Sequence, residues 1–113
     1  MSTVSKQFQD FILDLLSPLN AVGRRMFGGV GLFHDGVMFG LLVRDVCYLR
    51  VDDSTRGRFE QAGSQPFSYN RAGKLVSLAA YYELPDGLLD RPDELLQWAR
   101  DSIGAARLAK RRR

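Results

Sequence analysis

The residues of this chain that could carry out covalent chemistry are few, because the sequence holds one histidine, His34, and one cysteine, Cys47. A cysteine and a histidine act as nucleophile and base only when their side chains lie within hydrogen-bonding reach. His34 precedes Asp35-Gly36, which is typical of a tight hairpin turn, so its ring is expected to be solvated. Cys47 shares an apolar strand face with Leu49 and Val51, where no cation would lower its pKa. The sequence therefore predicts no catalytic residue, no metal ligand and no cofactor, and hence no enzyme.

A glycine cluster, Gly28, Gly29 and Gly31, is the other feature that could hold a ligand, because glycine-rich loops cradle phosphates. The third glycine of a dinucleotide-binding fingerprint is missing, and no Gly-Lys-Ser/Thr sequence follows. The segment also continues into a predicted hairpin rather than into a helix whose N-terminus binds anions. Glycine within a strand marks a bulge or the close approach of another backbone. We therefore interpret these glycines as structural.

Aromatic and basic side chains interleave on the predicted exposed side of the strands. This candidate interaction surface consists of Tyr48, Arg50, Tyr69, Arg71, Lys74, Tyr81 and Tyr82. Tyrosine and arginine are enriched at protein interfaces, and the same mixture stacks on nucleic-acid bases. Alternatively, the tyrosines pack across strands and the cations form an ordinary solvated rim.

Positive charge is concentrated at the end of the chain. The formal net charge is +3, yet Lys110, Arg111, Arg112 and Arg113 carry +4, so the preceding residues hold 12 basic and 13 acidic side chains. With Arg107, these four cations form a basic tail over residues 107–113. Such a run is usually a solvated helix end, where cations suit the helix dipole. Alternatively, the basic tail makes a weak, non-specific and salt-dependent contact with nucleic acid.

The elements that must position these residues follow from the spacing of apolar side chains. Residues 4–16 have helical spacing that ends at Ser17-Pro18, and a turn is expected over 19–25. Five runs that alternate or are rich in Val, Leu, Phe and Tyr are expected as strands: 29–34, 37–43, 46–51, 66–69 and 74–84. A short helix follows Asp52 or Asp53 and is stopped by Gly63, and a last helix starts near Asp90.

These elements predict an α+β, two-layer fold. It has a five-stranded, largely antiparallel sheet with an N-terminal helix, a short middle helix and a C-terminal helix. The chain of 113 residues, with 45% hydrophobic and 26% charged side chains, suits one domain over residues 1–106 followed by the tail. It shows neither a membrane-spanning apolar run nor a secretory signal, and its single cysteine fits a reducing compartment. We therefore expect a cytoplasmic protein without membrane contact.

Six segments follow one another in a recognisable order: Arg25–Leu32, Asp35–Gly40, Tyr48–Asp52, Gly63–Tyr69, Tyr81–Pro85 and Leu95–Ala99. In this linear pattern the chain resembles the N-terminal domain of the TfoX/Sxy family of bacterial competence regulators over about residues 8–106. The motif residues within and beside these segments are interpreted as structural: Met26, Phe27, Gly28, Gly29, Gly31, Gly36, Phe39, Gly63, Pro66, Phe67 and Trp98. The family supplies no catalytic residue to carry over.

The resemblance implies a non-catalytic role in the transcription of DNA-uptake genes, alongside a catabolite-activator-type protein. Full-length regulators of the family carry a second, helical domain after this one, so their competence activity is not transferred directly. The leading hypothesis is a small regulatory module that contacts a protein partner such as a transcription regulator. An unpaired sheet edge would also favour a homodimer. The alternative is a direct, non-specific nucleic-acid-binding protein that uses the Tyr/Arg surface and the tail.

Overall fold

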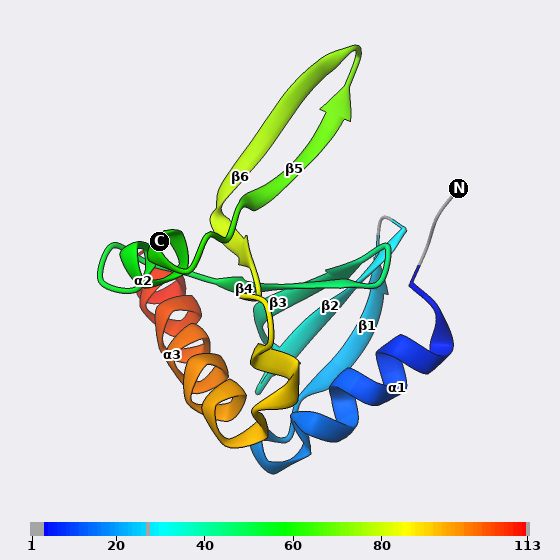
Figure 1. The fold of residues 1–113 in the computed structure, drawn as a ribbon, viewed down its shortest axis with the longest axis vertical. Coiled ribbons are helices and arrows are strands. Elements are labelled where there is room, and N and C mark those ends of the chain that lie inside the picture. The colour runs from blue at the N-terminus through cyan, green and yellow to red at the C-terminus, as the bar shows by residue number, and fades with distance from the viewer. Residues whose placement is uncertain (1–3, 27, 113) are drawn as a thin grey trace.

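The computed structural model describes residues 4–26 and 28–112, which form one antiparallel sheet and the helices that pack against it (Figure 1). The helical elements are α1 (Lys6–Leu15), η1 (Ser17–Leu19), α2 (Arg56–Gln61), η2 (Leu88–Asp90) and α3 (Pro92–Arg111). The strands are β1 (Val22–Met26), β2 (Gly29–His34), β3 (Val37–Val43), β4 (Val46–Arg50), β5 (Pro66–Arg71) and β6 (Lys74–Glu83). The predicted α+β class and the three expected helices are confirmed. No helix of the described residues is long and apolar enough to cross a membrane.

The sheet has six strands in the order β1-β2-β3-β4-β6-β5, one more than the sequence predicted. The additional strand is β1, which occupies residues expected to form a turn and pairs with β2 from Val22↔Phe33 to Met26↔Gly29. Its sequence contains adjacent Arg24 and Arg25, so it shows no apolar alternation. Pairing with a neighbouring strand decides its conformation, because strand formation depends on context more than on intrinsic preference.

Two-residue turns close the hairpins. Asp35 and Gly36 have φ angles of 49° and 79°, as a primed turn requires, which confirms the predicted Asp-Gly hairpin. Ala72 and Gly73, with φ of 53° and 80°, close the β5–β6 hairpin in the same way. The short helix and its stop also follow the prediction, since Gly63 has a φ of 83° just after α2.

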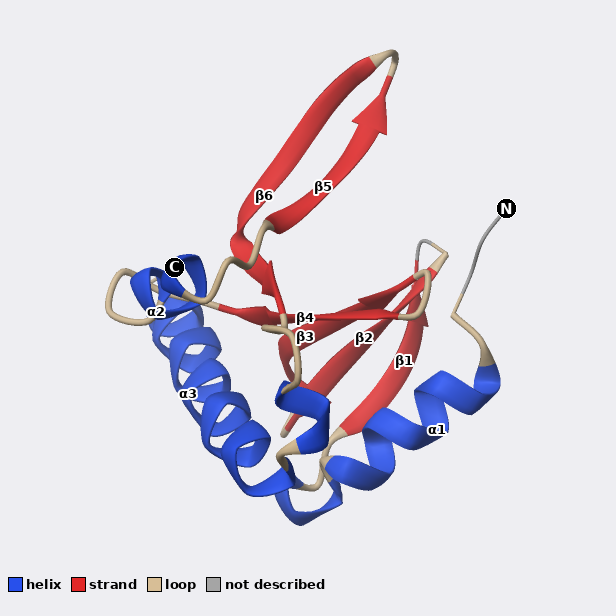
Figure 2. Ribbon diagram, viewed as in Figure 1, coloured by secondary structure: helices blue, strands red, loops and turns tan. Residues whose placement is uncertain are grey.

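The main core lies between one face of the sheet and the helices. On this helical face, Val30, Leu32, Leu42 and Leu49 have no solvent exposure. They pack with side chains of α1, η2 and α3 that include Ile12, Leu88, Leu95 and Ala99. Figure 2 shows α1, η2 and α3 together on one side of strands β1–β4. The opposite side, the open face, is crossed by none of the described helices.

Strand β6 pairs with two different strands along its length, and this determines how the β5–β6 hairpin is oriented. Its last residues, Tyr81 to Glu83, pair with β4, whereas Lys74 to Leu78 pair with β5. The register between β5 and β6 shifts abruptly between Pro66↔Tyr82 and Phe67↔Leu78. Such an irregularity bends a strand and increases its twist. The hairpin consequently leaves the sheet and projects as an arm, defined here as residues 67–78 (Figure 1).

Candidate protein interface

Cys47 and His34, the two residues that could have acted as nucleophile and base, both contribute to the packing of the fold. Cys47 is 5% exposed in the main core, and burial raises its pKa to about 12, so its thiol stays protonated. The expectation of a solvated His34 is wrong, because its side chain is only 20% exposed at the end of β2. Its Nδ1 lies 2.7 Å from the carbonyl oxygen of Leu19, which it reaches as a donor. This bond ties the turn after α1 to the sheet, and the other ring nitrogen, Nε2, faces Oδ2 of Asp35 at 3.3 Å.

The glycines near the start of the sheet allow close packing. A Cβ on Gly29 would lie 2.6 Å from the carbonyl oxygen of Leu42. A Cβ on Gly31 would lie 2.8 Å from the Phe33 ring and 3.0 Å from the sulfur atoms of Met26 and Met38. Side chains and backbone therefore already occupy the space beside Gly29 and Gly31, whereas Gly28, with a φ of 79°, has nothing within 4 Å of its Cβ position. Phe27, which was assigned to the same motif, lies outside the described residues.

The structure divides the predicted Tyr/Arg surface between the two faces of the sheet. Tyr82 pairs with Leu49 on the helical face and is 5% exposed, so its assignment to the exposed side was wrong. Tyr48 and Tyr81 do lie on the open face, but they are 8% and 7% exposed because the arm covers them. Alternation along β6 requires this division, since neighbouring residues such as Tyr81 and Tyr82 point to opposite faces.

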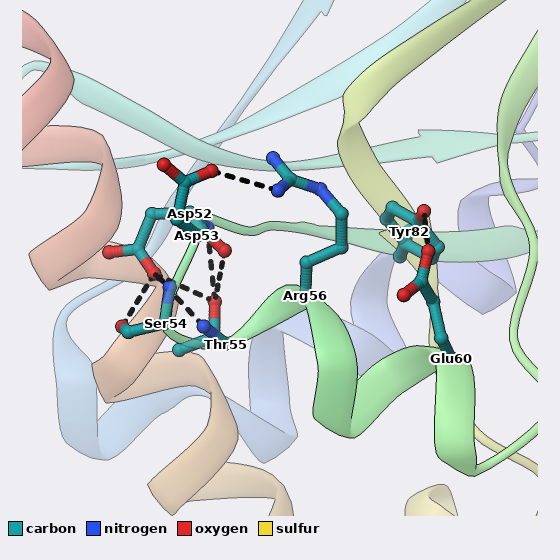
Figure 3. A network of polar contacts seen from close by, with 7 residues as sticks. All are labelled: Asp52, Asp53, Ser54, Thr55, Arg56, Glu60 and Tyr82. Carbon is teal, nitrogen blue, oxygen red and sulfur yellow. Dashed lines mark hydrogen bonds and ion pairs between the residues drawn. The ribbon is translucent and has the colours of Figure 1, made fainter.

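The hydroxyl of Tyr82 takes part in a polar network that holds α2 against the sheet (Figure 3). It donates to Oε2 of Glu60 at 2.8 Å, and this hydrogen bond raises the pKa of Tyr82. At the start of α2, the Asp52 carboxylate accepts from the backbone N–H groups of Ser54 and Thr55. The side-chain hydrogen bond from Ser54 is the main cause that lowers the pKa of Asp52. The expectation that Asp52 or Asp53 caps α2 is wrong, because the N-cap is Thr55 and the Asp52 contacts close the turn before the helix. The Tyr82–Glu60 bond anchors α2 to the sheet.

Next to the base of the arm, the open face carries a second apolar cluster. Its buried members are Leu41, Tyr48, Phe67 and Tyr81, and Met38, Val43, Val46, Tyr69 and Ala80 pack around them. The Phe67 ring stands edge-on to Tyr48 with 5.0 Å between ring centroids, so the arm is tied to the sheet at its base. Arg50 places its guanidinium 5.5 Å from the Tyr81 ring centroid. The arm buries the four central side chains, and the partly buried apolar side chains around them leave the rim of this cluster accessible for contact.

The arm has two different sides. Strand pairing places Phe67, Tyr69 and Arg71 opposite Leu78, Val76 and Lys74, and Phe67 points to the open face. These six residues form the inner side of the arm. Ser68, Asn70, Leu75 and Ser77 form its outer side, where the Ser68 and Ser77 hydroxyls lie 2.9 Å apart. Leu78 on the inner side is 41% exposed and Leu75 on the outer side 71% exposed, so the arm presents apolar side chains to solvent.

A hollow of about 330 Å³ lies away from the arm, between the C-terminal end of β6 and the start of β4. Its apolar lining includes Phe8, Val46, Leu84, Pro85 and Leu89, and its acidic residues are Asp45, Glu83, Asp86 and Asp90. No basic side chain lies within 4 Å of these four carboxylates among the described residues. No three of the described His, Cys, Asp or Glu side chains are grouped to hold a metal ion. The hollow is thus suited to a cationic side chain with an apolar stem.

The predicted basic tail continues α3, which is helical through Arg111. Arg107 is directed toward the β2–β3 turn, with its Nη2 3.5 Å from Oδ2 of Asp35. Lys110, Arg111 and Arg112 are exposed at the helix end, where positive charge is favourable. Arg113 lies outside the described residues. The role of the basic tail in nucleic-acid binding stays a prediction.

Two features of the interface were missed from the sequence. The hollow joins Phe8 of α1 to residues between 45 and 90, and packing alone brings these together. The arm was predicted as a hairpin but not as a projection, because its bend comes from the register shift after Pro66. A usable signal was the length of β6, whose 10 residues exceed the 6 residues of β5.

Comparison with known proteins agrees with this architecture. A family model described as the TfoX N-terminal domain matches residues 14–106. The DNA transformation protein TfoX1 of Aliivibrio fischeri is 28% identical over 110 residues, which cover 97% of this chain and 51% of that protein. The DNA transformation protein TfoX of Haemophilus influenzae is 32% identical over 83 residues, 71% of this chain and 38% of that protein. The chain therefore spans about half, or less, of the length of the curated relatives it matches.

Proposed function

This chain belongs to the TfoX N-terminal domain family, and from that premise we propose that it is a small, non-catalytic regulatory module of DNA uptake that acts by protein contact in the cytoplasm. The link to DNA uptake is supported by the two relatives, which are both DNA transformation proteins. The partner we propose is a protein of the transcription machinery for DNA-uptake genes. Because the chain matches only the first part of those relatives, this activity is proposed for it and not inherited from them.

The main support for a mechanism by protein contact is the surface formed by the inner side of the arm and the open face. They form one apolar surface with an aromatic base at Tyr48, Phe67 and Tyr81 and an exposed Leu78 beyond it. Interfaces between proteins have this composition, with aromatic residues at the centre and arginine nearby. Arg50, packed over Tyr81, supplies that arginine.

The proposal is tested by complementation in the bacterium that carries this gene. The gene is deleted, and the wild-type chain, Leu78→Ser or Leu75→Ser is supplied from a plasmid at equal protein level. Leu78 and Leu75 are exposed leucines of the same strand, but only Leu78 lies on the inner side, so Leu75→Ser is the matched control. The readouts are transcripts of DNA-uptake genes and transformation frequency, with thermal melting to verify that each variant is folded.

We expect the deletion to lower both readouts, the wild type and Leu75→Ser to restore them, and Leu78→Ser to restore them poorly. A deletion that leaves both readouts unchanged contradicts the link to DNA uptake. Full restoration by Leu78→Ser contradicts the assignment of the contact to the inner side.

A further inference from the structure

We propose that the arm docks on a second copy of this chain, with Arg71 and Lys74 entering the acidic hollow of the partner. This inference rests on the proposed protein contact by the arm and adds a second copy of the chain as the partner of its charged tip.

The arm is poorly supported within a single copy. A two-stranded hairpin is marginally stable in water unless another layer covers it. Strand β5 is also an edge of the sheet, with its outer backbone groups unpaired. Such an edge is a template for pairing with another chain unless it is covered. Apart from its base at Phe67, the arm leaves Leu75 and Leu78 exposed, so a second surface that covers it would bury apolar area.

The tip of the arm and the hollow are complementary in charge. Arg71 and Lys74 are directly paired across the hairpin, both are exposed, and among the described residues neither lies within 4 Å of a carboxylate. The hollow offers Glu83, Asp86 and Asp90 without a basic partner, above an apolar floor. Asp45 is engaged by the backbone N–H of Ser5 at 2.8 Å, but its second oxygen is free of any hydrogen bond from a described residue. Opposite charges of this kind favour encounter and fix the register of a contact.

The tip cannot reach the hollow of its own chain. Glu83 lines the hollow at one end of β6, and Lys74 stands at the other end of the same strand. Nine residues of extended strand separate them, which corresponds to about 30 Å. The occupant of the hollow must therefore come from another molecule. A second copy carries both the arm and the hollow, and a two-fold arrangement would satisfy two arms and two hollows at once.

A polyanionic partner fits less well. Nucleic acid bound by Arg71 and Lys74 would leave the carboxylates of the hollow without a basic partner. A second copy uses both charge clusters.

The test measures the self-association of the full chain by sedimentation velocity and light scattering over a wide concentration range, at low and moderate salt. The variants are Arg71→Glu/Lys74→Glu at the tip and Asp86→Lys/Asp90→Lys in the hollow. Arg111→Glu/Arg112→Glu, at the far end of α3, is the matched control for the tip variant, with the same change of charge. Circular dichroism verifies that every variant folds, and all substituted positions are exposed.

We expect a concentration-dependent dimer for the wild type and the control. Each interface variant should raise the dissociation constant at least 10-fold, and the variant that combines all four interface changes, with the charges exchanged, should recover association. A wild type that stays monomeric throughout overturns the proposal, as does an interface variant that dimerises like the wild type or a combined variant that fails to recover. Loss of duplex DNA binding by the tip variant, in a monomeric wild type, would assign the arm to nucleic acid instead. None of these results alters the complementation outcome for Leu78→Ser, so a failure of this inference is distinguishable from a failure of the proposed function.

Discussion

Replacing Gly29 by alanine should destabilise the protein, because the space beside this residue is already filled. The new Cβ would lie 2.6 Å from the Leu42 carbonyl oxygen and 3.2 Å from Cγ2 of Val43, whereas ordinary contacts begin at 3.4 Å. The Leu42 oxygen belongs to the backbone of β3, a central strand, so relief requires the strands to separate by about 0.8 Å. Overpacking of this kind costs about 1–3 kcal/mol.

The assay is unfolding by heat and, at equilibrium, in urea, followed by circular dichroism and by the fluorescence of Trp98. For a domain of this size, the expected loss of stability corresponds to a melting temperature lower by roughly 5 to 15 °C. Gly104→Ala is the matched control, since nothing lies within 4 Å of its added Cβ and it sits in the exposed part of α3. Alanine there should stabilise the helix by up to about 1 kcal/mol.

A Gly29→Ala variant as stable as the wild type would refute the steric reasoning. A second measurement addresses the phosphate alternative directly. Inorganic phosphate or a nucleotide that bound at these glycines would raise the melting temperature of the wild type, increasingly with the logarithm of its concentration above the dissociation constant, and much less so that of the variant. We expect no such rise in either protein.

Three further predictions concern groups outside the arm. Cys47 should resist a thiol reagent at pH 8 in the native protein and react fully in denaturant, because burial raises its pKa to about 12; rapid native labelling would contradict its place in the core. Asp52→Ala should lower the free energy of unfolding by about 1 kcal/mol at pH 7, measured by urea titration. The pKa of Asp52 is lowered in the folded protein, so the stability that its carboxylate contributes is complete above the ordinary pKa of 3.8 and is lost as the pH falls through the folded-state pKa. The wild type and the variant should therefore become equally stable in strong acid. An equal difference in stability at all pH values would contradict a role of the ionised carboxylate. Deleting residues 107–113 should remove any weak binding to duplex DNA, which in the intact chain should fall with a log–log salt slope of about −4; binding that is unchanged by salt or by the deletion would rule out the helix end as its source.

Local signals in the sequence were sufficient for most of the fold. Asp35-Gly36 supplies the positive φ of a hairpin turn, and Ser17-Pro18 ends the first helix, so these boundaries are determined by residues next to one another. Strand β1 escaped prediction because its conformation depends on β2, which pairs along its whole length. Its Arg24 and Arg25 give it the appearance of a loop.

The interface was harder to predict than the fold. Tyr81 and Tyr82 are equally aromatic, and only the pairing of β6 with β4 shows that Tyr82 faces the helices. The burial of Tyr48 results from the arm that folds over it, through Phe67, and no local pattern encodes that contact. The cations Arg71 and Lys74 were found from the sequence, whereas their isolation at the tip of an arm required the structure.

The central claim is that this protein works through a contact surface and holds no substrate. The most direct measurement is co-purification of tagged wild type, Leu78→Ser and Leu75→Ser from native cytoplasm, with and without nuclease, quantified for each captured protein. The account predicts that the wild type and Leu75→Ser retain the same protein after nuclease treatment, and that Leu78→Ser loses most of it. Capture that disappears with nuclease, or that is identical for all three chains, would contradict it.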